Sequence, residues 1–544
     1  MTERSLFRFA VPAVLFACAV AAIASAWWWM GADVPMPPSP LARGGKLYCV
    51  SYAPFRGTQS PLNPPVQIET WQIDQDLAQL SQLTDCVRTY AIEFGLDRIP
   101  EIAKRHGMKV IQGIWLSGNP EKNRVEIETA IRLAKQFPDV IRALVVGNEV
   151  LLRGEMTAQD LAATIRNVKS QAGVPVTYAD VWEFWLRYRD VYDAVDFVTI
   201  HILPYWEDFP ISARDSAAHV DSIRRKVVAV FPNKDILIGE TGFPSAGRMR
   251  AGAKPSPSNQ ARVMHEIIAL AKRDNFRVNV IEAFDQPWKR RLEGTVGGHW
   301  GLFDADSRMI KFGWGAPKSD HPGWRRQAAG GVLTATLIFG VAMLGRFRMT
   351  KSVSAPPALW IAVAVIAAIG GTFVPLAAEK VPLESLGIAG WLRSGVLFAL
   401  AIACPLVASA AIMRAASIPD FASVLTRNAG KFDCRLTPAI GLLFVALTLV
   451  AILVALGLVF DPRYKDFPYA PLTAAAVPFF VLSFFAQRAG GPRSLAETVA
   501  AGTLVLSLIY IAFNEGFENW QSLWLCTLFA ALAFTLSRAR TGRG

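Results

Sequence analysis

Cysteine and histidine are scarce in this sequence, and the two do not occur at metal-binding spacing. Six cysteines and six histidines are spread over 544 residues, and no CxxC pair occurs. This excludes a disulfide framework and the common zinc sites. Two of the cysteines, Cys49 and Cys86, fall on neighbouring predicted strands. They form either a disulfide or two buried thiols, and the strong tendency of cysteine to be buried favours two thiols.

A basic stripe interleaved with aromatic residues is also missing, although the formal net charge is +12. Nucleic-acid binding is therefore not expected. Much of the positive charge lies in short loops beside apolar segments, where lysine and arginine set the orientation of membrane helices. These residues are Arg346, Arg348, Lys351, Arg414, Arg427, Lys431, Arg435, Arg488, Arg493, Arg538, Arg540 and Arg543.

Outside residues 45–324, long apolar runs dominate. The run Leu6–Met30 is long enough to cross a bilayer. It is either a signal peptide or an anchor, and the cluster Trp27–Trp29, typical of an interfacial aromatic belt, favours an uncleaved anchor. Seven further spans are predicted at 328–345, 357–378, 388–413, 437–460, 471–487, 495–513 and 522–537.

The predicted organisation has four parts and places both termini in the cytoplasm. An anchor at 1–30 and a linker at 31–45 precede an exported domain at 46–324. An all-α transmembrane domain follows at 328–544. The cytoplasmic loops are too short to fold a domain that uses nucleotide sugars.

Within residues 46–324, short runs rich in β-branched and aromatic residues alternate with helical patterns such as Ile99–His106 and Arg124–Phe137. Eight such units in about 275 residues predict a (β/α)8 TIM barrel, whose active site lies at the C-terminal ends of the strands. The predicted strands are 47–52, 86–90, 109–115, 142–148, 175–179, 196–202, 235–240 and 279–285.

Two of these strands run into a glutamate. The fourth is followed by Glu149 and the seventh ends at Glu240, so both carboxyl groups are expected at one face of the barrel. Glycoside cleavage needs such a pair, because one group protonates the leaving oxygen while the other attacks the anomeric carbon or activates water. A separation of about 5 Å would indicate retention of configuration, and about 6.5–9.5 Å inversion.

The sequences around these glutamates, Val-Gly-Asn-Glu-Val at 146–150 and Gly-Glu-Thr-Gly-Phe-Pro-Ser at 239–245, resemble glycoside hydrolase family 17, the β-1,3-glucanase and glucanosyltransferase family. The resemblance covers about residues 46–315 and implies Glu149 as acid/base and Glu240 as nucleophile. Phe243 stands where the plant enzymes typically have Trp, which argues against their endo-cleavage pattern. The whole chain resembles the bacterial multi-span membrane β-(1,6)-glucan synthase proteins of cyclic β-(1,3),(1,6)-glucan production.

Further residues at the predicted mouth suit a sugar cleft. Asn148 is expected either to hydrogen-bond the sugar 2-hydroxyl or to cap the following turn, and Tyr205 either to orient Glu240 or to pack beneath a loop. His201 also ends a strand, where a structural hydrogen bond is the expected role. Retaining glycoside chemistry needs no metal or cofactor, and none is expected.

Other side chains point toward the same mouth with less defined roles. Tryptophans there are expected either to stack on glucose rings or to fill the core, and these are Trp115, Trp206 and Trp288. The remaining candidates for substrate binding are Tyr52, Arg88, Tyr90 and Glu282.

The function expected from this resemblance is a transglycosylase at the outer face of the bacterial inner membrane, in the periplasm. It would transfer a β-1,3-glucan unit onto another glucan, including transfer to O6, beside a separate glucan polymerase and in contact with the lipid bilayer. Two alternatives stay open: a β-1,3-glucanase, and a non-catalytic glucan-binding or export accessory. The linkage, the acceptor and the oligomeric state do not follow from the sequence.

Overall fold

The chain divides into two compact units in the computed structural model, which describes residues 3–350, 355–425, 436–486, 488–489 and 494–538. One unit is Val34–Lys318, and the other combines Met1–Asp33 with Ser319–Gly544. The first helix, α1 (Glu3–Met30), packs against α10 (Trp324–Thr350) and α11 (Pro357–Glu384), far away in the sequence. Seven residues of the predicted basic loops lie outside the described residues: Lys351, Arg427, Lys431, Arg435, Arg493, Arg540 and Arg543.

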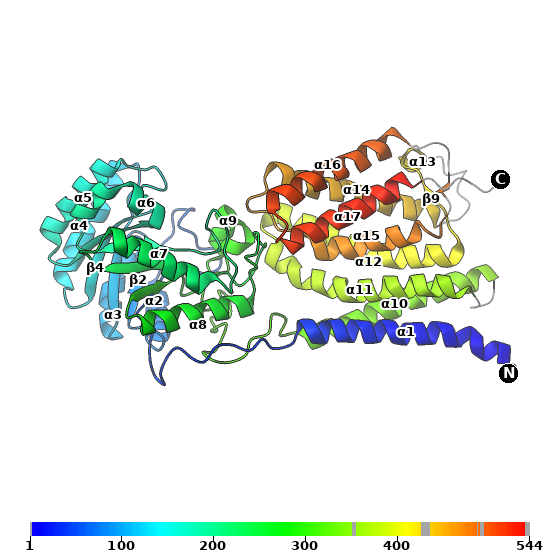
Figure 1. Ribbon diagram of the computed structural model, residues 1–544, viewed down its shortest axis with the longest axis horizontal. Coiled ribbons are helices and arrows are strands. Elements are labelled where there is room, and N and C mark those ends of the chain that lie inside the picture. The colour runs from blue at the N-terminus through cyan, green and yellow to red at the C-terminus, as the bar shows by residue number, and fades with distance from the viewer. Residues whose placement is uncertain (1–2, 351–354, 426–435, 487, 490–493, 539–544) are drawn as a thin grey trace. The chain divides into compact units, whose positions relative to one another are not determined.

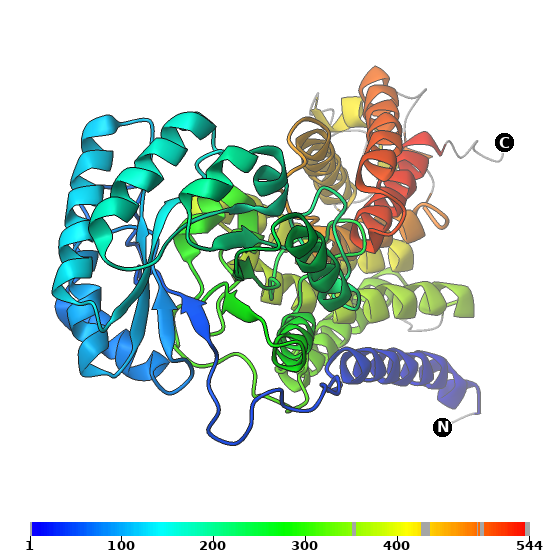
Figure 2. The same cartoon turned by 60° about the vertical axis from the view of Figure 1, so that its left-hand side comes forward.

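Eight parallel strands close into a barrel in the order β1 to β8, as predicted. Helices surround the strands (Figures 1 and 2). The elements are β1 (Cys49–Ser51), α2 (Thr70–Leu80), β2 (Cys86–Arg88), α3 (Ile99–Arg105), β3 (Lys109–Ile114), α4 (Pro120–Gln136), β4 (Ile141–Asn148), α5 (Ala158–Ala172), β5 (Val176–Val181), α6 (Trp182–Arg187), β6 (Val198–His201), α7 (Ser216–Val230), β7 (Ile236–Thr241), α8 (Pro257–Arg273), β8 (Arg277–Val280) and α9 (Arg290–Gly297), with short 3-10 turns at Leu96–Arg98, Arg189–Ala194 and Pro287–Lys289.

The eighth strand differs most from its prediction. It ends at Val280, so Glu282, expected on this strand, follows it instead. Beyond Val280 the segment keeps a bond to β1, since the Ala283 amide donates to the Ser51 carbonyl at 2.8 Å. It also gains bonds from a later loop: the Leu302 amide donates to the Glu282 carbonyl and the Phe303 amide to the Ala283 carbonyl, each at 2.8 Å. The segment after β8 therefore pairs with a later loop.

Alternation along the strands divides the barrel core into two parts. Val50 and Val87 belong to the large cluster that packs the strands against the helices. Residues one position away form a separate buried cluster, consistent with the opposite face of the strands. That cluster contains Cys49, Cys86, Ile111, Val145, Ala179 and Leu237.

Cys49 and Cys86 form a disulfide, so the preference for two buried thiols was wrong. The pairing of β1 with β2 sets Val50 opposite Val87, which leaves the two cysteines facing each other with a Cα–Cα distance of 4.4 Å. This distance lies at the lower end of the range that disulfides span.

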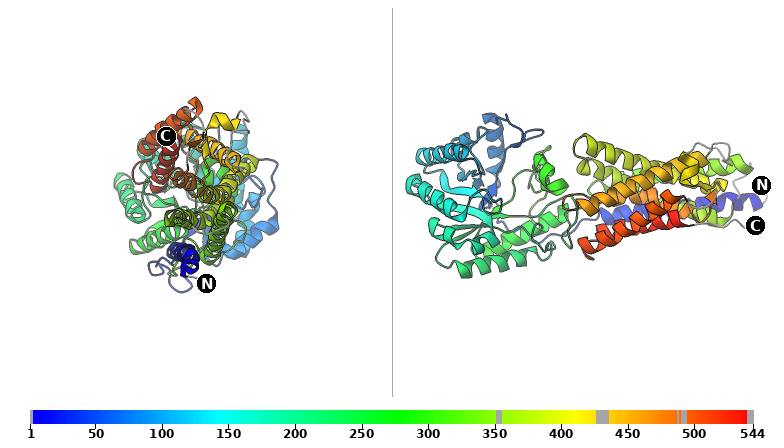
Figure 3. Two further views of the ribbon diagram at one scale, coloured as in Figure 1. Left: turned by 90° about the vertical axis from the view of Figure 1, so that its right-hand side faces the viewer. Right: turned by 90° about the horizontal axis from the view of Figure 1, so that it is seen from above.

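The second unit is a bundle of long apolar helices, which Figure 3 shows running side by side. Seven described helices are long and apolar enough to cross a membrane by length and composition. They are α1, α10, α11, α12 (Gly387–Arg414), α14 (Thr437–Phe460), α16 (Leu495–Glu515) and α17 (Trp520–Ser537); the unit also holds α13 (Phe421–Leu425) and the two-residue strands β9 (Ile418–Pro419) and β10 (Arg488–Ala489).

The predicted span at 471–487 is shorter than expected. Its helix, α15 (Tyr469–Leu482), has 14 residues, and the chain turns at 483–485. At about 1.5 Å per residue, it is about 21 Å long, less than the ~30 Å hydrocarbon layer. Most of its residues are buried, and it packs against α11, α12 and α17.

Candidate active site

A buried arginine organises the C-terminal end of the barrel. Arg88, the last residue of β2, is fully buried and lies 2.7 Å from the Glu240 carboxylate. The same guanidinium donates to the Gly239 carbonyl at 3.0 Å and to the Asn148 amide oxygen. Asn148 has its side-chain nitrogen without a hydrogen bond in the described chain, so this nitrogen is available to a ligand. Three strands, β2, β4 and β7, are thus linked through one side chain.

Glu149 is held in an uncommon backbone conformation just beyond β4. Its φ is +53°, and Gly147 two residues earlier has φ +88°. A non-glycine residue in the left-handed region is typical of functional sites, where surrounding contacts maintain it. Here the Glu149 amide donates to the Ala179 carbonyl at 2.8 Å, and the Arg153 amide donates to the Glu149 carbonyl at 2.9 Å.

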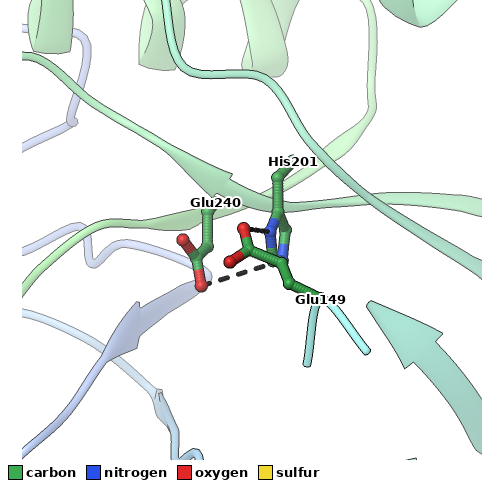
Figure 4. Close-up of side chains that lie close together, drawn as sticks. All are labelled: Glu149, His201 and Glu240. Atoms are coloured by element: carbon green, nitrogen blue, oxygen red, sulfur yellow. Dashed lines mark hydrogen bonds and ion pairs between the residues drawn. The ribbon is translucent and has the colours of Figure 1, made fainter. Parts of the chain in front are cut away.

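The structure brings Glu149, Glu240 and His201 together. A carboxylate oxygen of each glutamate and a ring nitrogen of His201 all lie within 4.8 Å of one another. Figure 4 shows the imidazole beside both carboxylates, 2.9 Å from Glu149 and 3.7 Å from Glu240. Glu240 is buried, whereas the side chain of Glu149 is 23% exposed. One carboxyl group is therefore enclosed and the other reaches solvent.

The surroundings of Glu240 favour its ionised form. Burial alone would raise the pKa of this carboxyl group, but His201, Arg88 and Lys289 together hold the pKa well below its usual range. The positive charges of Arg88 and Lys289 already compensate the charge of Glu240. A divalent cation on the same carboxylate would meet their repulsion, so the arrangement does not favour a metal site.

A second set of buried charges lies beyond β8. Glu282 is paired with Lys289 at 2.8 Å, yet burial raises the pKa of Glu282 to about 7. Burial also raises the pKa of Glu293, and the charges of Glu149 and Glu240 add to this shift. Glu282 is 1% exposed and ion-paired with Lys289, and its expected contact with substrate stays a prediction.

Asp180 on β5 connects the loop after Glu149 to the sheet. It accepts a hydrogen bond from the Tyr178 hydroxyl, which in turn accepts one from the Leu151 amide at 2.9 Å. Burial raises the pKa of Asp180 to about 6, and the Glu149 charge contributes to the increase. Neither Asp180 nor Tyr178 was predicted as a site residue, because nothing in the local sequence around either one shows that the two side chains meet.

Two predicted tyrosines have other partners in the structure. The Tyr205 hydroxyl donates to the Arg248 carbonyl at 3.0 Å. The expected orientation of Glu240 by Tyr205 stays a prediction. The Tyr52 hydroxyl donates to Asp76 at 3.0 Å, and the ring is buried. A hydroxyl has a single proton to donate, and both tyrosines have committed theirs.

The remaining aromatic candidates vary in exposure. Trp115 is 38% exposed, and Arg153 lies 4.2 Å from its ring centre. Trp206 and Trp288 are partly buried; the Trp288 indole donates to Gln286 at 2.8 Å. Tyr90 packs on Arg88 at 4.8 Å, and burial with the Glu240 charge raises the pKa of its hydroxyl well above the usual value.

His201 and Lys289 both lower the pKa of Glu240, and neither was predicted from the sequence to do so. His201 was expected to have only a structural role, although the same strand-end rule that indicated the two glutamates applies to it. Lys289 carries no such signal, because it lies nine residues beyond the end of β8 in a 3-10 turn. Only the fold brings its charge close enough to affect Glu240.

Part of this chain is similar to known glycoside hydrolases. Residues 49–301 match the family model described as the BtgE/BtgC glycoside hydrolase domain. A glucan 1,3-beta-glucosidase of Candida albicans is 27% identical over 257 residues, which is 43% of this chain and 83% of the relative.

Two solved structures from Rhizomucor miehei are similar to this chain. One is an active-site mutant of a β-1,3-glucanosyltransferase in complex with laminaritriose (TM-score 0.44, 25% identity, 49% of this chain and 97% of that one). The other is a glycoside hydrolase family 17 β-1,3-glucanosyltransferase (TM-score 0.43, 26% identity, 48% of this chain and 95% of that one).

A substitution of Gly239 tests how tightly the side chains around it are packed. An added Cβ would lie 2.3 Å from Thr199 Cγ2 and 3.3 Å from the His201 ring. We expect Gly239→Ala to destabilise the barrel by about 1–3 kcal/mol through overpacking. The measurement is the apparent melting temperature of the detergent-solubilised protein. The control is Gly118→Ala, whose new Cβ meets only a Glu155 carboxylate oxygen at 3.2 Å; equal melting temperatures for the two variants would contradict this packing.

Proposed function

Since residues 49–301 form a glycoside hydrolase domain of the family 17 type, we propose that this protein is a membrane-anchored, retaining β-glucan transglycosylase acting on β-1,3-glucan chains. Glu149 is the acid/base and Glu240 the nucleophile. The glucan 1,3-beta-glucosidases among its relatives support the substrate class.

The observation that carries the mechanism is the short distance between the two glutamates. Their nearest carboxylate oxygens lie within 4.8 Å. Retaining enzymes separate the two carboxyl groups by about 5–5.5 Å, whereas inverting enzymes leave about 6.5–9.5 Å for a water molecule. The separation therefore favours direct attack by Glu240 on the anomeric carbon.

In the first step, a Glu240 oxygen forms a bond to the anomeric carbon while the glycosidic bond breaks. Glu149 gives its proton to the leaving oxygen and becomes a carboxylate. The ion pair with Arg88 and the charge of Lys289 keep Glu240 ionised before attack. The free Asn148 amide is suited to bind the 2-hydroxyl of the donor sugar, a contact that strengthens in the transition state.

In the second step, Glu149 removes a proton from the acceptor as its oxygen replaces Glu240 at the anomeric carbon. A sugar hydroxyl as acceptor gives transfer, including β-1,6 linkage when the hydroxyl is O6. Water gives hydrolysis. Transfer is supported by the resemblance of the whole multi-span chain to bacterial glucan synthase proteins. Hydrolysis is the second candidate, because the curated relatives are glucosidases.

We place the barrel in the periplasm and both termini in the cytoplasm. The disulfide is typical of an oxidising compartment. With the N-terminus inside, Arg348 and Arg414, at the ends of α10 and α12, come to lie in the cytoplasm. Arg538, which follows α17 directly, does so if α15 also crosses. The acidic residues Glu384 and Asp461 then lie outside.

Reporter fusions test this topology. Alkaline phosphatase fused after Lys318 is expected to be active, because it folds only in the periplasm, and a green fluorescent protein fused after Gly544 is expected to fluoresce. A fluorescent fusion after Lys318 serves as the negative control. An active phosphatase at the C-terminus would contradict the proposal and show that α15 does not cross.

Product length distinguishes transfer from hydrolysis. Detergent-solubilised protein incubated with β-1,3-gluco-oligosaccharides is expected to give products longer than the donor, measured by mass spectrometry. We expect Glu240→Ala to lower turnover by more than about 10⁴-fold, because no other group can form the glycosyl-enzyme. Glu128→Ala, on the exposed face of α4, is the matched control and should retain activity. Products that are only shorter would favour the hydrolase.

The pH dependence of kcat/KM tests the role of Arg88. A nucleophile with a lowered pKa stays ionised in mild acid, so activity is lost only when the pH falls through that low pKa. In Arg88→Met the pKa of Glu240 should rise, and the acid limb should move up by about 1–3 pH units. Arg88→Lys keeps the positive charge and should leave the limb near its original position. A limb unchanged in Arg88→Met would refute this electrostatic role.

A further inference from the structure

His201 lies between the two proposed catalytic carboxyl groups. It is the last residue of β6 and has no exposed surface. Its Nδ1 lies 2.9 Å from Glu149 Oε1, and its Nε2 lies 3.7 Å from Glu240 Oε1 (Figure 4). Only the first distance is that of a hydrogen bond. Within the described chain, Nε2 has no hydrogen-bond partner.

The neighbouring strand is shaped to admit this ring. Gly239 precedes Glu240 directly, and its missing side chain leaves the space that the His201 ring and the Thr199 methyl group occupy. The pairing of β6 with β7 shifts between Ile200 and His201, which sets His201 opposite Glu240. The imidazole thus fills the space between β7 and the end of β4.

The contact with Glu149 distinguishes the two oxygens of its carboxyl group. Glu149 Oε1 faces His201 Nδ1, and the direction of this hydrogen bond depends on the tautomer of the ring. In the tautomer that carries its proton on Nδ1, the ring donates to Oε1. Oε1 can accept this bond in both the acid and the carboxylate form. Oε2 is then the oxygen that carries the acid proton.

We propose that His201 is a positioning residue that holds Glu149 Oε1 through Nδ1 and so directs the acid proton on Oε2 toward the leaving oxygen. This role rests on the proposed function. The ring gains or loses no proton in the cycle: Glu149 transfers its own proton to the leaving oxygen. The hydrogen bond from Nδ1 strengthens as the carboxylate develops, because a bond to a charged acceptor is stronger than one to a neutral acceptor.

Two further carboxyl groups lie near the ring. Glu240 faces Nε2 from β7. Asp180 interacts electrostatically with the ring from β5, and its carboxylate accepts hydrogen bonds from Tyr178, Val181 and Leu152. Neither comes within hydrogen-bond distance of Nδ1. The contact with Glu149 is therefore the feature to isolate by substitution.

Three substitutions of His201 distinguish the role of Nδ1 from that of Nε2. The amide of His201→Asn can take the place of Nδ1, the longer amide of His201→Gln reaches toward Nε2, and His201→Ala supplies neither. Each variant of the full chain is assayed in detergent with two aryl β-1,3-linked glucobiosides. The 2,4-dinitrophenolate group leaves without a proton, whereas the phenolate group needs one from Glu149.

We expect His201→Ala to lose about 10²-fold or more in turnover of the phenyl donor, within the range for general acid catalysis, and less than about 10-fold for the dinitrophenyl donor. His201→Asn should recover most of the loss, and His201→Gln should not. The melting temperature of each variant shows that it is folded.

Other outcomes overturn the role. Equal losses on both donors, or equal recovery by Asn and Gln, would mean that His201 supports the fold without acting through Glu149. Turnover that survives Glu240→Ala would instead refute the proposed function, and this role would fall with it. The two failures are therefore distinguishable.

Discussion

The buried guanidinium of Arg88 requires compensation, and this requirement sets the geometry at the C-terminal end of the barrel. A charge removed from water is costly unless it is paired and hydrogen-bonded. Arg88 meets this condition through the Glu240 carboxylate, the Gly239 carbonyl and the Asn148 amide oxygen. The contacts that neutralise the arginine are the same ones that place Glu240, favour its ionised form and leave the Asn148 amide nitrogen free for a ligand.

Strand alternation explains why this charge and an apolar core coexist in one barrel. Cys86 and Arg88 are two residues apart on β2 and therefore face the same side. Cys86 joins a buried apolar cluster and a disulfide with Cys49, whereas Arg88 reaches the polar end. Asn279, opposite Cys49, donates to Ser51, opposite Arg88, and to the Gly239 carbonyl, each at 2.7 Å. Polarity thus increases along the barrel toward the carboxylates.

The second unit has helices long and apolar enough to cross a membrane, where hydrocarbon offers no water to unpaired backbone groups. Long helices satisfy the backbone internally, and the charged residues near the end of α11 are paired: Glu379 with His321 at 3.0 Å, and Lys380 with Glu384 at 2.9 Å. The short α15 is enclosed by neighbouring helices, which satisfies the same constraint without full length.

The sequence alone determined the parallel barrel, most of its strand positions, the apolar spans and the placement of Glu149 and Glu240 at strand ends, because these depend on local periodicity and on a rule of the fold. Only the tertiary structure decided which groups meet: the pairing of Cys49 with Cys86, the hydroxyl partners of Tyr52 and Tyr205, the ion pair of Lys289 with Glu282, and the place of His201 between two carboxylates. Such contacts join residues far apart in the chain. Strand register and the packing of neighbouring side chains select them, and neither is visible in a local pattern.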